Sequence, residues 1–223
     1  MSNQKYLLNT KNQFEDKVVI VTGSTQGSGA ETAKLFAYRG AKGITICGRS
    51  EDQGNEIKKE IETIGSECLY VKADLFEVDD CRNIVAQTDK TFGNVDCLVN
   101  VAGFTERGTI LSTTIDNYDK NFNINTRAPF ILMQDSIKIM IREKTKGTIV
   151  NILSMAMHSG MSFISAYSGS KAALATITKN VANAVSGHHI RVNALNIGWT
   201  DTPGEDKIQK KFHEGGEDWL QQA

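Results

Sequence analysis

"KVVIVTGSTQGSGAETAKLF", residues 17–36, joins a short apolar run to a glycine-rich turn and then to a segment of helical period. Its glycines, Gly23, Gly27 and Gly29, fall where the predicted strand turns into the predicted helix. Glycines at such a junction permit a tight turn and let the backbone approach a phosphate at the positive end of the helix. The GxxxGxG spacing differs from GxGxxG and from a P-loop, and by itself it is also compatible with a tight turn alone. The stretch therefore predicts the first strand–helix unit of a parallel sheet.

The rest of the chain repeats this alternation of apolar runs and helical-period segments. The predicted strands are 17–23, 43–48, 67–74, 95–103, 147–154 and 190–198. The predicted helices are 29–40, 55–65, 78–93, 128–144 and 166–185. Strands alternating with helices indicate βαβ units, and nearly continuous apolar strands indicate a sheet covered on both faces. We therefore predict an α/β protein with a doubly wound, Rossmann-type, three-layer fold, a mainly parallel sheet and six strands.

Length and charge restrict the domain count and the partners. The chain has 223 residues, 40% of them apolar, and predicts a single domain over 1–223, with a polar arm at 1–13 and a polar tail, a candidate substrate lid, at 203–223. Lys and Arg number 25 against 26 Asp and Glu, so nucleic acid and anionic membranes are poor partner hypotheses. The start lacks a signal peptide pattern and no apolar run is long enough to span a membrane, which predicts a cytoplasmic protein.

Cysteine and histidine spacing gives no support to a metal or redox site. The four cysteines, Cys47, Cys68, Cys81 and Cys97, form no CxxC pair and stand mostly beside apolar residues. We expect buried, reduced thiols. The histidines, which are His158, His188, His189 and His213, have no neighbouring acids or cysteines at ligand spacing. We therefore expect no metal.

Further polar motifs follow the glycine turn in a fixed order. These are Asp74 in "ADL", "NVAG" at 100–103, Asn125 in "NINTRAPF" and Ser154 at the end of "VNILS". Tyr167 and Lys171 stand four positions apart in "SAYSGSKAAL", and Ser154 precedes Tyr167 by 13 residues. In this order and spacing, the chain resembles the short-chain dehydrogenase/reductase family over residues 17–202. The resemblance implies an NAD(P)-dependent oxidoreductase that interconverts a secondary alcohol and a ketone by hydride transfer.

The resemblance also assigns catalytic roles. Tyr167 would be the general acid and base, Ser154 would bind the substrate oxygen, and Lys171 would bind the nicotinamide ribose. Asn125 would hold a water that links Lys171 to solvent, and the substrate contacts would be Ser154, Ala156 and Tyr167. The residue types agree with these roles, because a lysine at i+4 lies beside the phenol on a helix and its charge favours the phenolate. Singly, Tyr167 could be a core residue, Ser154 a turn cap and Asn125 a helix N-cap.

The resemblance implies a set of cofactor contacts as well. They are Gly23, Ser24, Thr25, Gly27, Ser28, Gly29, Arg49, Asp74, Leu75, Asn100, Ala102, Gly103, Tyr167, Lys171, Gly198, Thr200 and Thr202. Gly48 and Arg49 close the second strand, where a dinucleotide fold reads the adenosine ribose. An arginine there, in place of an acid, suits the 2′-phosphate, so we expect NADP in preference to NAD. If Arg49 is only a solvated loop charge, the choice stays open.

The chain departs from the family pattern at several places. Ser28 replaces an aliphatic residue, Val101 the second Asn of NNAG, and Ile197 a proline. The family would continue past Ala223 through a seventh strand. Either the sequence is a truncated product, or the sixth strand forms an edge that another chain or the tail would have to cover. This departure keeps open the alternative of a catalytically impaired or regulatory nucleotide-binding protein.

The resemblance further implies a homo-oligomer, a homodimer or homotetramer, built on the helices that start near Pro129 and Ala166. The predicted substrate pocket is lined by residues 155–166 and 104–110, including four apolar side chains, Met155, Met157, Met161 and Phe163, and three polar ones, Glu106, Arg107 and His158. These side chains do not identify the substrate.

Overall fold

The computed structural model describes residues 12–212, so most of the expected polar arm, the tail from residue 213 and His213 lie outside the described residues. The strands are β1 (Val18–Val21), β2 (Gly43–Gly48), β3 (Glu67–Lys72), β4 (Cys97–Asn100), β5 (Thr148–Ser154) and β6 (Arg191–Ile197). They form one sheet in the order β3-β2-β1-β4-β5-β6, and every pairing is parallel. The predicted doubly wound α/β fold with six strands is confirmed, although most strands are shorter at their ends than expected.

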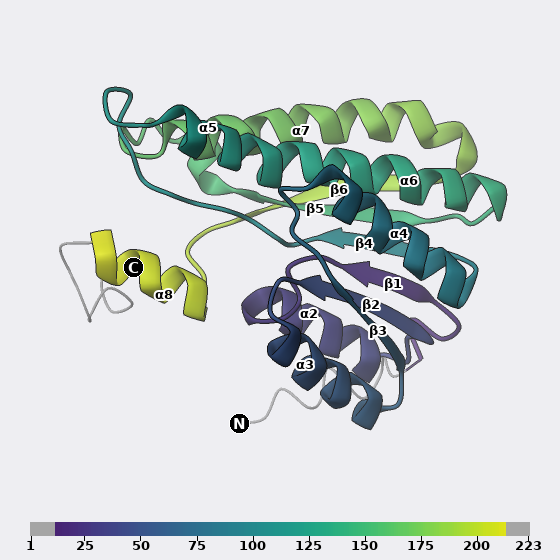
Figure 1. The fold of residues 1–223 in the computed structure, drawn as a ribbon. Coiled ribbons are helices and arrows are strands. Elements are labelled where there is room, and N and C mark those ends of the chain that lie inside the picture. The colour runs from purple at the N-terminus through teal and green to yellow at the C-terminus, as the bar shows by residue number, and fades with distance from the viewer. Residues whose placement is uncertain (1–11, 213–223) are drawn as a thin grey trace, which may run out of the picture.

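The helices cover the sheet in two layers (Figure 1). They are α2 (Gly27–Tyr38), α3 (Glu51–Ile64), α4 (Val78–Phe92), α5 (Ile115–Phe122), α6 (Ala128–Arg142), α7 (Ser165–Val185) and α8 (Pro203–Phe212). Short helical turns are η1 (Asn123–Arg127), η2 (Met155–His158) and η3 (Ser186–His188). Helices α2 and α3 lie on one face, α4, α6 and α7 lie on the other, and α8 stands apart at one end of the molecule (Figure 1).

Each face of the sheet buries its own apolar core. On one face, the β1 side chains Val19 and Val21 pack against small residues of α2, such as Ala33, and against Ile61 of α3. On the other face, Ile20 joins a larger cluster that includes Leu132 of α6 and Leu174 of α7. Alternate side chains of β1 therefore pack into the cores on opposite faces of the sheet, as expected for a strand that is buried on both sides.

The side chains of β5 and β6 are less completely buried by helices than those of β1. In β5, Ile149 and Leu153 are buried toward α6 and α7, whereas Ile152 between them is only half-buried. In β6, Leu195 and Ile197 are exposed by 56% and 37%. Within the described residues β6 pairs with β5 alone and is the last strand of the sheet.

The sequence missed two helices and misplaced several helix ends. Helix α5 was not predicted, and it continues through the π-helical turn η1 directly into α6. Most residues of α5 are polar, so the sequence showed too few apolar positions for a helical period to be recognised. Its two aromatic rings, Tyr118 and Phe122, stack with 4.5 Å between their centroids. The amphipathic "KIQKKF" of the expected tail is part of α8, which starts at Pro203, a favourable first helical residue.

All four cysteines are free, as predicted, and Cys47, Cys68 and Cys81 are buried while Cys97 is half-buried. Burial raises the pKa of the Cys47 and Cys68 thiols to about 12. These thiols therefore remain protonated and behave as small apolar side chains.

Candidate active site

Two cavities lie side by side at the carboxyl edge of the sheet, the edge at which α8 stands (Figure 1). Their linings contain the residues that directly follow the strands, for example Gly23 after β1, Ala73 after β3 and Met155 after β5. Parallel strands bring their carboxyl ends together, and the order of strands reverses between β1 and β4, which opens a crevice there. Both cavities share Ser28, Gly103 and Thr202 in their walls, so a ligand in one can contact a ligand in the other.

The first cavity has a volume of about 670 Å³. It is lined by most of the predicted cofactor contacts, namely Gly23, Thr25, Gly27, Ser28, Gly29, Arg49, Asp74, Leu75, Ala102, Gly103 and Thr202. Gly23 and Gly27 have positive φ angles of 61° and 56°, which a glycine adopts at little cost. A Cβ at Gly29 would collide with the carbonyl oxygen of Gly23. The turn therefore needs glycine at these positions for its own packing, and this leaves the start of α2 open toward the cavity.

The structure places two of the predicted cofactor residues in the protein interior. The Ser24 hydroxyl donates to the carbonyl oxygen of Val21 at 2.6 Å and accepts from the backbone N–H of Cys47 at 3.0 Å. Asn100 donates from Nδ2 to Oδ1 of Asn151 at 2.8 Å, and both side chains are buried. Ser24 thus ties β1 to β2, and Asn100 ties β4 to β5, while neither lines the described cavities.

Arg49 lies at the rim of the first cavity, beside the end of β2. The Tyr70 hydroxyl donates to the carbonyl oxygen of Gly48 at 2.9 Å, and a Cβ at Gly48 would lie 2.6 Å from the Thr25 side chain. These contacts hold the backbone that carries Arg49. Asp74 accepts the backbone N–H of Phe76 at 3.0 Å, which fixes the loop after β3 against the same cavity.

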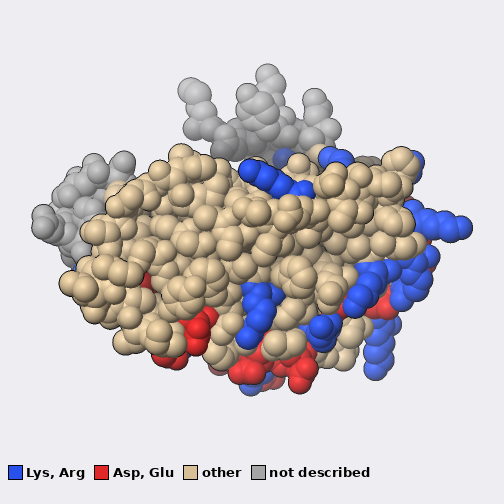
Figure 2. Space-filling model, turned by 90° about the horizontal axis from the view of Figure 1, so that it is seen from above, with Lys and Arg blue, Asp and Glu red and all other residues tan. Residues whose placement is uncertain are grey.

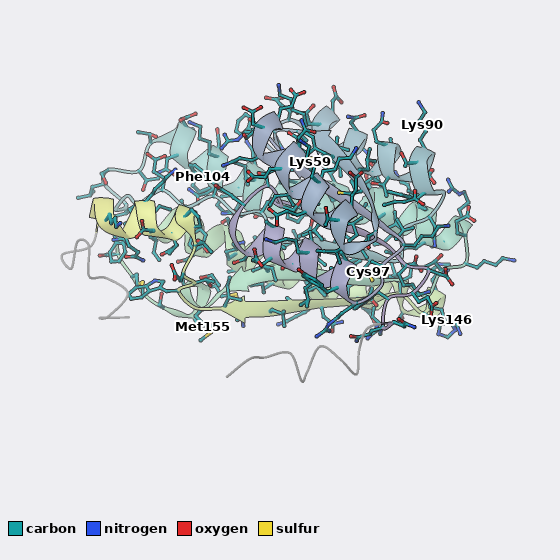
Figure 3. All side chains as sticks on the ribbon, turned by 90° about the horizontal axis from the view of Figure 1, so that it is seen from below. Lys59, Lys90, Cys97, Phe104, Lys146 and Met155 are labelled. Carbon is teal, nitrogen blue, oxygen red and sulfur yellow. The ribbon has the colours of Figure 1, made fainter. Side chains whose placement is uncertain are left out.

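The second cavity, of about 540 Å³, contains the predicted catalytic groups. Ser154, Tyr167 and Lys171 line it, as do the predicted substrate residue Ala156 and the predicted cofactor contacts Gly198 and Thr200. Phe104 and Met155, which follow β4 and β5, both lie at the end of the molecule where α8 stands (Figure 3). The lining is largely apolar, and it includes the predicted Met155, Met161 and Phe163. Met157 instead packs against the core, and His158 lies 3.5 Å from Asn196.

Tyr167 and Lys171 lie one helical turn apart on α7, with the Lys171 Nζ 6.0 Å from the centroid of the Tyr167 ring. The ammonium is 3% exposed and donates to the carbonyl oxygen of Ile152 at 2.8 Å. Burial lowers the pKa of Lys171 to about 8. Burial raises the pKa of Tyr167, although hydrogen bonds with Ser154 and Thr105 lower it, and the charge of Glu205 raises it further. The net shift is upward and Lys171 is not among its causes, so the expectation that the Lys171 charge favours the phenolate during catalysis stays a prediction.

Asn125 is fully buried within η1 and acts as a clamp. Its Oδ1 accepts the backbone N–H of Phe104 at 2.8 Å, and its Nδ2 donates to the Phe104 carbonyl at 2.9 Å and to the Ser170 hydroxyl at 3.0 Å. A Cβ at Gly103 would lie 3.6 Å from Lys171 Nζ and 3.7 Å from Asn125 Oδ1. Asn125 is therefore not the N-cap of α6, and it joins the loop after β4 to α7 beside Lys171.

Ser154 fits both interpretations of its sequence position, the contact with a substrate oxygen and the turn cap. Its hydroxyl accepts the backbone N–H of Ala156 at 3.2 Å, which caps η2. The same side chain forms part of the cavity wall and hydrogen-bonds Tyr167. The cap fixes the hydroxyl at the end of β5, where it can donate to a substrate oxygen beside the phenol.

Further residues of the second cavity come from the predicted pocket segment 104–110 and from the predicted lid 203–223, although no motif singled them out. Thr105 hydrogen-bonds Tyr167, and Glu205, Ile208 and Gln209 of α8 line the cavity. The i, i+4 spacing of Glu205 and Gln209 places both on one face of α8.

Within residues 12–212, no group of three or more His, Cys, Asp or Glu side chains is arranged to hold a metal ion. In the same range, every helix is too short or too polar to cross a membrane.

Comparison with known proteins places this architecture among enzymes. The family profile for short chain dehydrogenases matches residues 17–212. The chain is 37% identical over 191 residues to an uncharacterized oxidoreductase of Thermotoga maritima, a match covering 86% of this chain and 74% of the relative. It is 31% identical over 200 residues to the galactitol 2-dehydrogenase of Agrobacterium fabrum, covering 90% and 77% of the two chains.

Solved structures agree with these sequence matches. A short-chain type dehydrogenase/reductase from Mycobacterium marinum superposes with a TM-score of 0.85 at 25% identity, over 93% of this chain and 81% of that one. A metagenomic short-chain oxidoreductase in complex with NADP superposes with a TM-score of 0.78 at 26% identity, over 84% of each chain.

Proposed function

Since this chain belongs to the short-chain dehydrogenase/reductase family and is an enzyme of that family, we propose that it interconverts a secondary alcohol and a ketone with Tyr167 as general acid and base. One observation carries the proposal: Tyr167, Ser154 and Lys171 converge in a cavity that adjoins a nucleotide-sized cavity behind a glycine turn. The chain forms a single dinucleotide-binding oxidoreductase domain in this proposal, with α8 as part of the substrate lid.

The residues of the first cavity suit a dinucleotide, because the glycine turn exposes backbone N–H groups at the start of α2 to a pyrophosphate. The nicotinamide of the bound cofactor accepts or supplies the hydride. Tyr167 takes the hydroxyl proton of the alcohol during oxidation and returns a proton to the carbonyl oxygen during reduction. Ser154 donates a hydrogen bond to the same oxygen, where negative charge develops.

Lys171 suits proton exchange with Tyr167. Its pKa of about 8 lies near neutral pH. Lys171 can therefore release and regain a proton at the pH at which Tyr167 exchanges one in this proposal. A Cβ at Gly103 would lie within 4 Å of both Lys171 Nζ and Asn125 Oδ1, so these two polar groups border the same space beside Gly103. In this proposal Asn125 holds a water there that connects Lys171 to solvent. In this proposal Lys171 also binds the nicotinamide ribose.

The test of this mechanism is Tyr167→Phe, which removes the hydroxyl and keeps the ring. Turnover on a panel of ketones, secondary alcohols and polyols should fall by about 10³-fold or more. Cofactor affinity, measured by isothermal titration calorimetry, should stay within about threefold. Undiminished turnover in Tyr167→Phe would contradict the proposal. Tight cofactor binding without turnover in the unaltered protein would favour a regulatory nucleotide-binding protein.

We propose NADP in preference to NAD, because Arg49 lies at the cavity rim on a backbone held by Tyr70 and Thr25. A guanidinium there binds a 2′-phosphate through charge-assisted hydrogen bonds. Arg49→Ala should weaken NADP binding by about 10- to 100-fold and leave NAD binding within about threefold. The exposed Arg82→Ala, which lies on α4 against Asp135, is the charge-matched control. An unchanged preference in Arg49→Ala would contradict the cofactor assignment.

We also propose a homo-oligomer and a reducing, cytoplasmic location. The face seen from above, over α6 and α7, shows a large area with few charged side chains (Figure 2). Exposed Phe130 of α6 lies in this layer. The four free thiols support the location, because disulfides are rare where thiols are kept reduced.

A further inference from the structure

Large apolar side chains stand exposed in the wall of the second cavity. Met155, Met161 and Phe163, from the segment between β5 and α7, are exposed by 53%, 41% and 39%. All three line the cavity that also contains Tyr167 and Ser154. Apolar side chains that gather at one place, rather than lying scattered, mark a binding surface, and covering them yields a gain in proportion to the area buried. The cavity therefore favours a ligand whose own surface is apolar.

Two opposite charges in the same wall are linked through one amide. Gln209 Nε2 donates to Glu205 Oε1 at 2.5 Å, and Arg107 Nη2 donates to Gln209 Oε1 at 3.0 Å. Burial lowers the pKa of Arg107, and the charge of Glu205 raises it, so the two charged groups act on each other directly as well. Since the positive and the negative side chain balance, this wall favours neither an anionic nor a cationic ligand.

Polar side chains that the sequence placed at the substrate pocket lie elsewhere or are engaged. Glu106 lines the first cavity and not the second. His158 is also outside the lining of the second cavity, and its Nε2 lies 3.5 Å from the Asn196 amide. Ser159 does line that cavity, and its hydroxyl donates to the Ala156 carbonyl at 2.9 Å. The several hydroxyls of a sugar or polyol would lose water here and find few partners, which is costly.

The apolar wall combines one fixed ring with two adaptable side chains. The Arg107 guanidinium carbon lies 5.1 Å from the centroid of the Phe163 ring, a cation–π contact that holds the ring. The backbone N–H of Gly108 donates to the Phe163 carbonyl at 2.8 Å, which fixes the chain beneath it. Met155 and Met161 have unbranched, polarizable side chains that adapt to apolar groups of different shape. The wall can therefore close around a bulky apolar group without a large rearrangement of its backbone.

We propose that the enzyme acts on an uncharged ketone, or on the corresponding secondary alcohol, that carries a bulky apolar group, and that Met155, Met161 and Phe163 form the subsite for this group. This inference rests on the proposed function, because Tyr167 and Ser154 define where in the cavity the reacting carbon lies. The volume of about 540 Å³ lies within the range of small-molecule sites, so a carbonyl at Tyr167 leaves room for such a group.

The first test measures kcat/KM for methyl ketones whose second group grows from ethyl to heptyl. The full chain is saturated with the cofactor it binds more tightly. Each added methylene should raise kcat/KM about two- to fourfold until the cavity is filled. A terminal hydroxyl or carboxylate in place of the last methyl group should lower kcat/KM about tenfold or more.

A kcat/KM that does not change with chain length, or that a terminal hydroxyl leaves unchanged, would overturn the inference. A subsite already covered by residues 213–223 or by a second copy of the chain would give that flat profile. Full activity in Tyr167→Phe would instead contradict the proposed function and leave the apolar subsite in place.

Met161→Gln keeps the length of the side chain and replaces its apolar end by an amide. It should lower kcat/KM about tenfold for methyl heptyl ketone and stay within about threefold for methyl ethyl ketone. Met161→Leu should retain the preference for the long ketone, because the side chain stays apolar and similar in volume. Leu35→Gln is the matched control, since Leu35 is 39% exposed on α2 and lines neither cavity, and it should leave both ketones within about twofold. Equal losses on both ketones in Met161→Gln would overturn the inference.

A binding measurement decides the matter if none of these ketones is reduced. Primary alkyl amides have nearly the shape of methyl ketones and do not accept a hydride here. Calorimetry of the protein–cofactor complex should show their affinity rising about two- to fourfold with each methylene, with a negative change in heat capacity. Met161→Gln should reduce this rise. Equal affinities for short and long amides in the unaltered protein would overturn the inference.

Discussion

Lys171 combines a proposed role in catalysis with a cost to the stability of the fold. Its side chain is buried and its ammonium donates to the Ile152 carbonyl. Burial lowers its pKa from 10.5 to about 8. With about 1.4 kcal/mol for each pKa unit, keeping this charge at pH 7 costs the fold about 3 kcal/mol. The folded-state pKa lies below the unfolded value, so this cost is fully present below pH 8. It is relieved as the pH rises from about 8 to 10.5.

Lys171→Met should therefore raise the free energy of unfolding at pH 7 by about 1 to 3 kcal/mol, while it removes the proposed proton path and the activity. The gain over the unaltered protein should shrink between pH 8 and pH 10.5. Urea unfolding followed by circular dichroism at several pH values measures both effects. Exposed Lys59→Met is the control and should change stability by less than about 0.5 kcal/mol. A variant that is less stable than the unaltered protein at pH 7 would contradict this account.

The spacing of Tyr167 from Ser154 and Lys171 identified it as a candidate catalytic residue. The same spacing did not predict the direction of its pKa shift. Sequence spacing correctly placed Lys171 one turn away, and this proximity suggested a lowered pKa. The depth at which the phenol is buried depends on how α7, η2 and α8 pack together, and that depth raises the pKa. The hydroxyls of Ser154 and Thr105, which come from distant segments, are the groups that oppose burial.

The glycine turn between β1 and α2 is required for packing, apart from the proposed contact with a phosphate. A side chain at Gly29 would strike the backbone of Gly23, and one at Gly23 would lie 2.8 Å from the Cα of Ala102 in the loop after β4. The turn is thus the point at which β1, α2 and the loop after β4 come into contact. A strained turn here would move the start of α2 away from the ligand.

Gly29→Ala should accordingly destabilise the protein by about 2 to 4 kcal/mol and weaken cofactor binding by about tenfold or more. Gly169→Ala is the matched control within a helix, because a Cβ there would meet Phe122 at 3.6 Å, an ordinary contact. That control should stabilise the protein by about 0.5 to 1 kcal/mol through helix propensity. Denaturant unfolding and cofactor titration give both quantities. Equal effects of the two substitutions would contradict the packing argument.

Helix η1 illustrates a local irregularity with a defined use. The π-helical turn between α5 and α6 places the Asn125 side chain so that it contacts both backbone groups of Phe104 and the hydroxyl of Ser170. Such turns interrupt regular hydrogen bonding and occur frequently at functional sites. Sequence patterns gave no indication of this turn, because its register depends on the packing of α6 and α7.

The molecule has one surface, over α6 and α7, on which charged side chains are few (Figure 2). Phe130 on α6 is 45% exposed. An uncharged face with an exposed aromatic side chain is typical of a surface that meets another protein. A second copy of the chain agrees with the proposed homo-oligomer.

Analytical ultracentrifugation at micromolar concentration should therefore show a dimer or a larger assembly. Phe130→Glu should shift it toward the monomer by about tenfold or more in dissociation constant, because it buries a charge in the interface. Leu35→Glu is the control, since Leu35 is 39% exposed on α2 in the opposite layer. A monomer in the unaltered protein, or equal effects of the two substitutions, would contradict the proposed interface.

The α/β class, the six strands and the family could be predicted from the sequence, because hydrophobic period, glycine placement and the Ser154–Tyr167–Lys171 spacing are local properties of the chain. It could not find the clamp of Asn125 on Phe104, the interior position of Ser24 and Asn100, or the alignment of Arg107 by Gln209. Those contacts join segments that lie far apart along the chain. Only the packing of the sheet, its helices and α8 decides which of these side chains meet and which are buried.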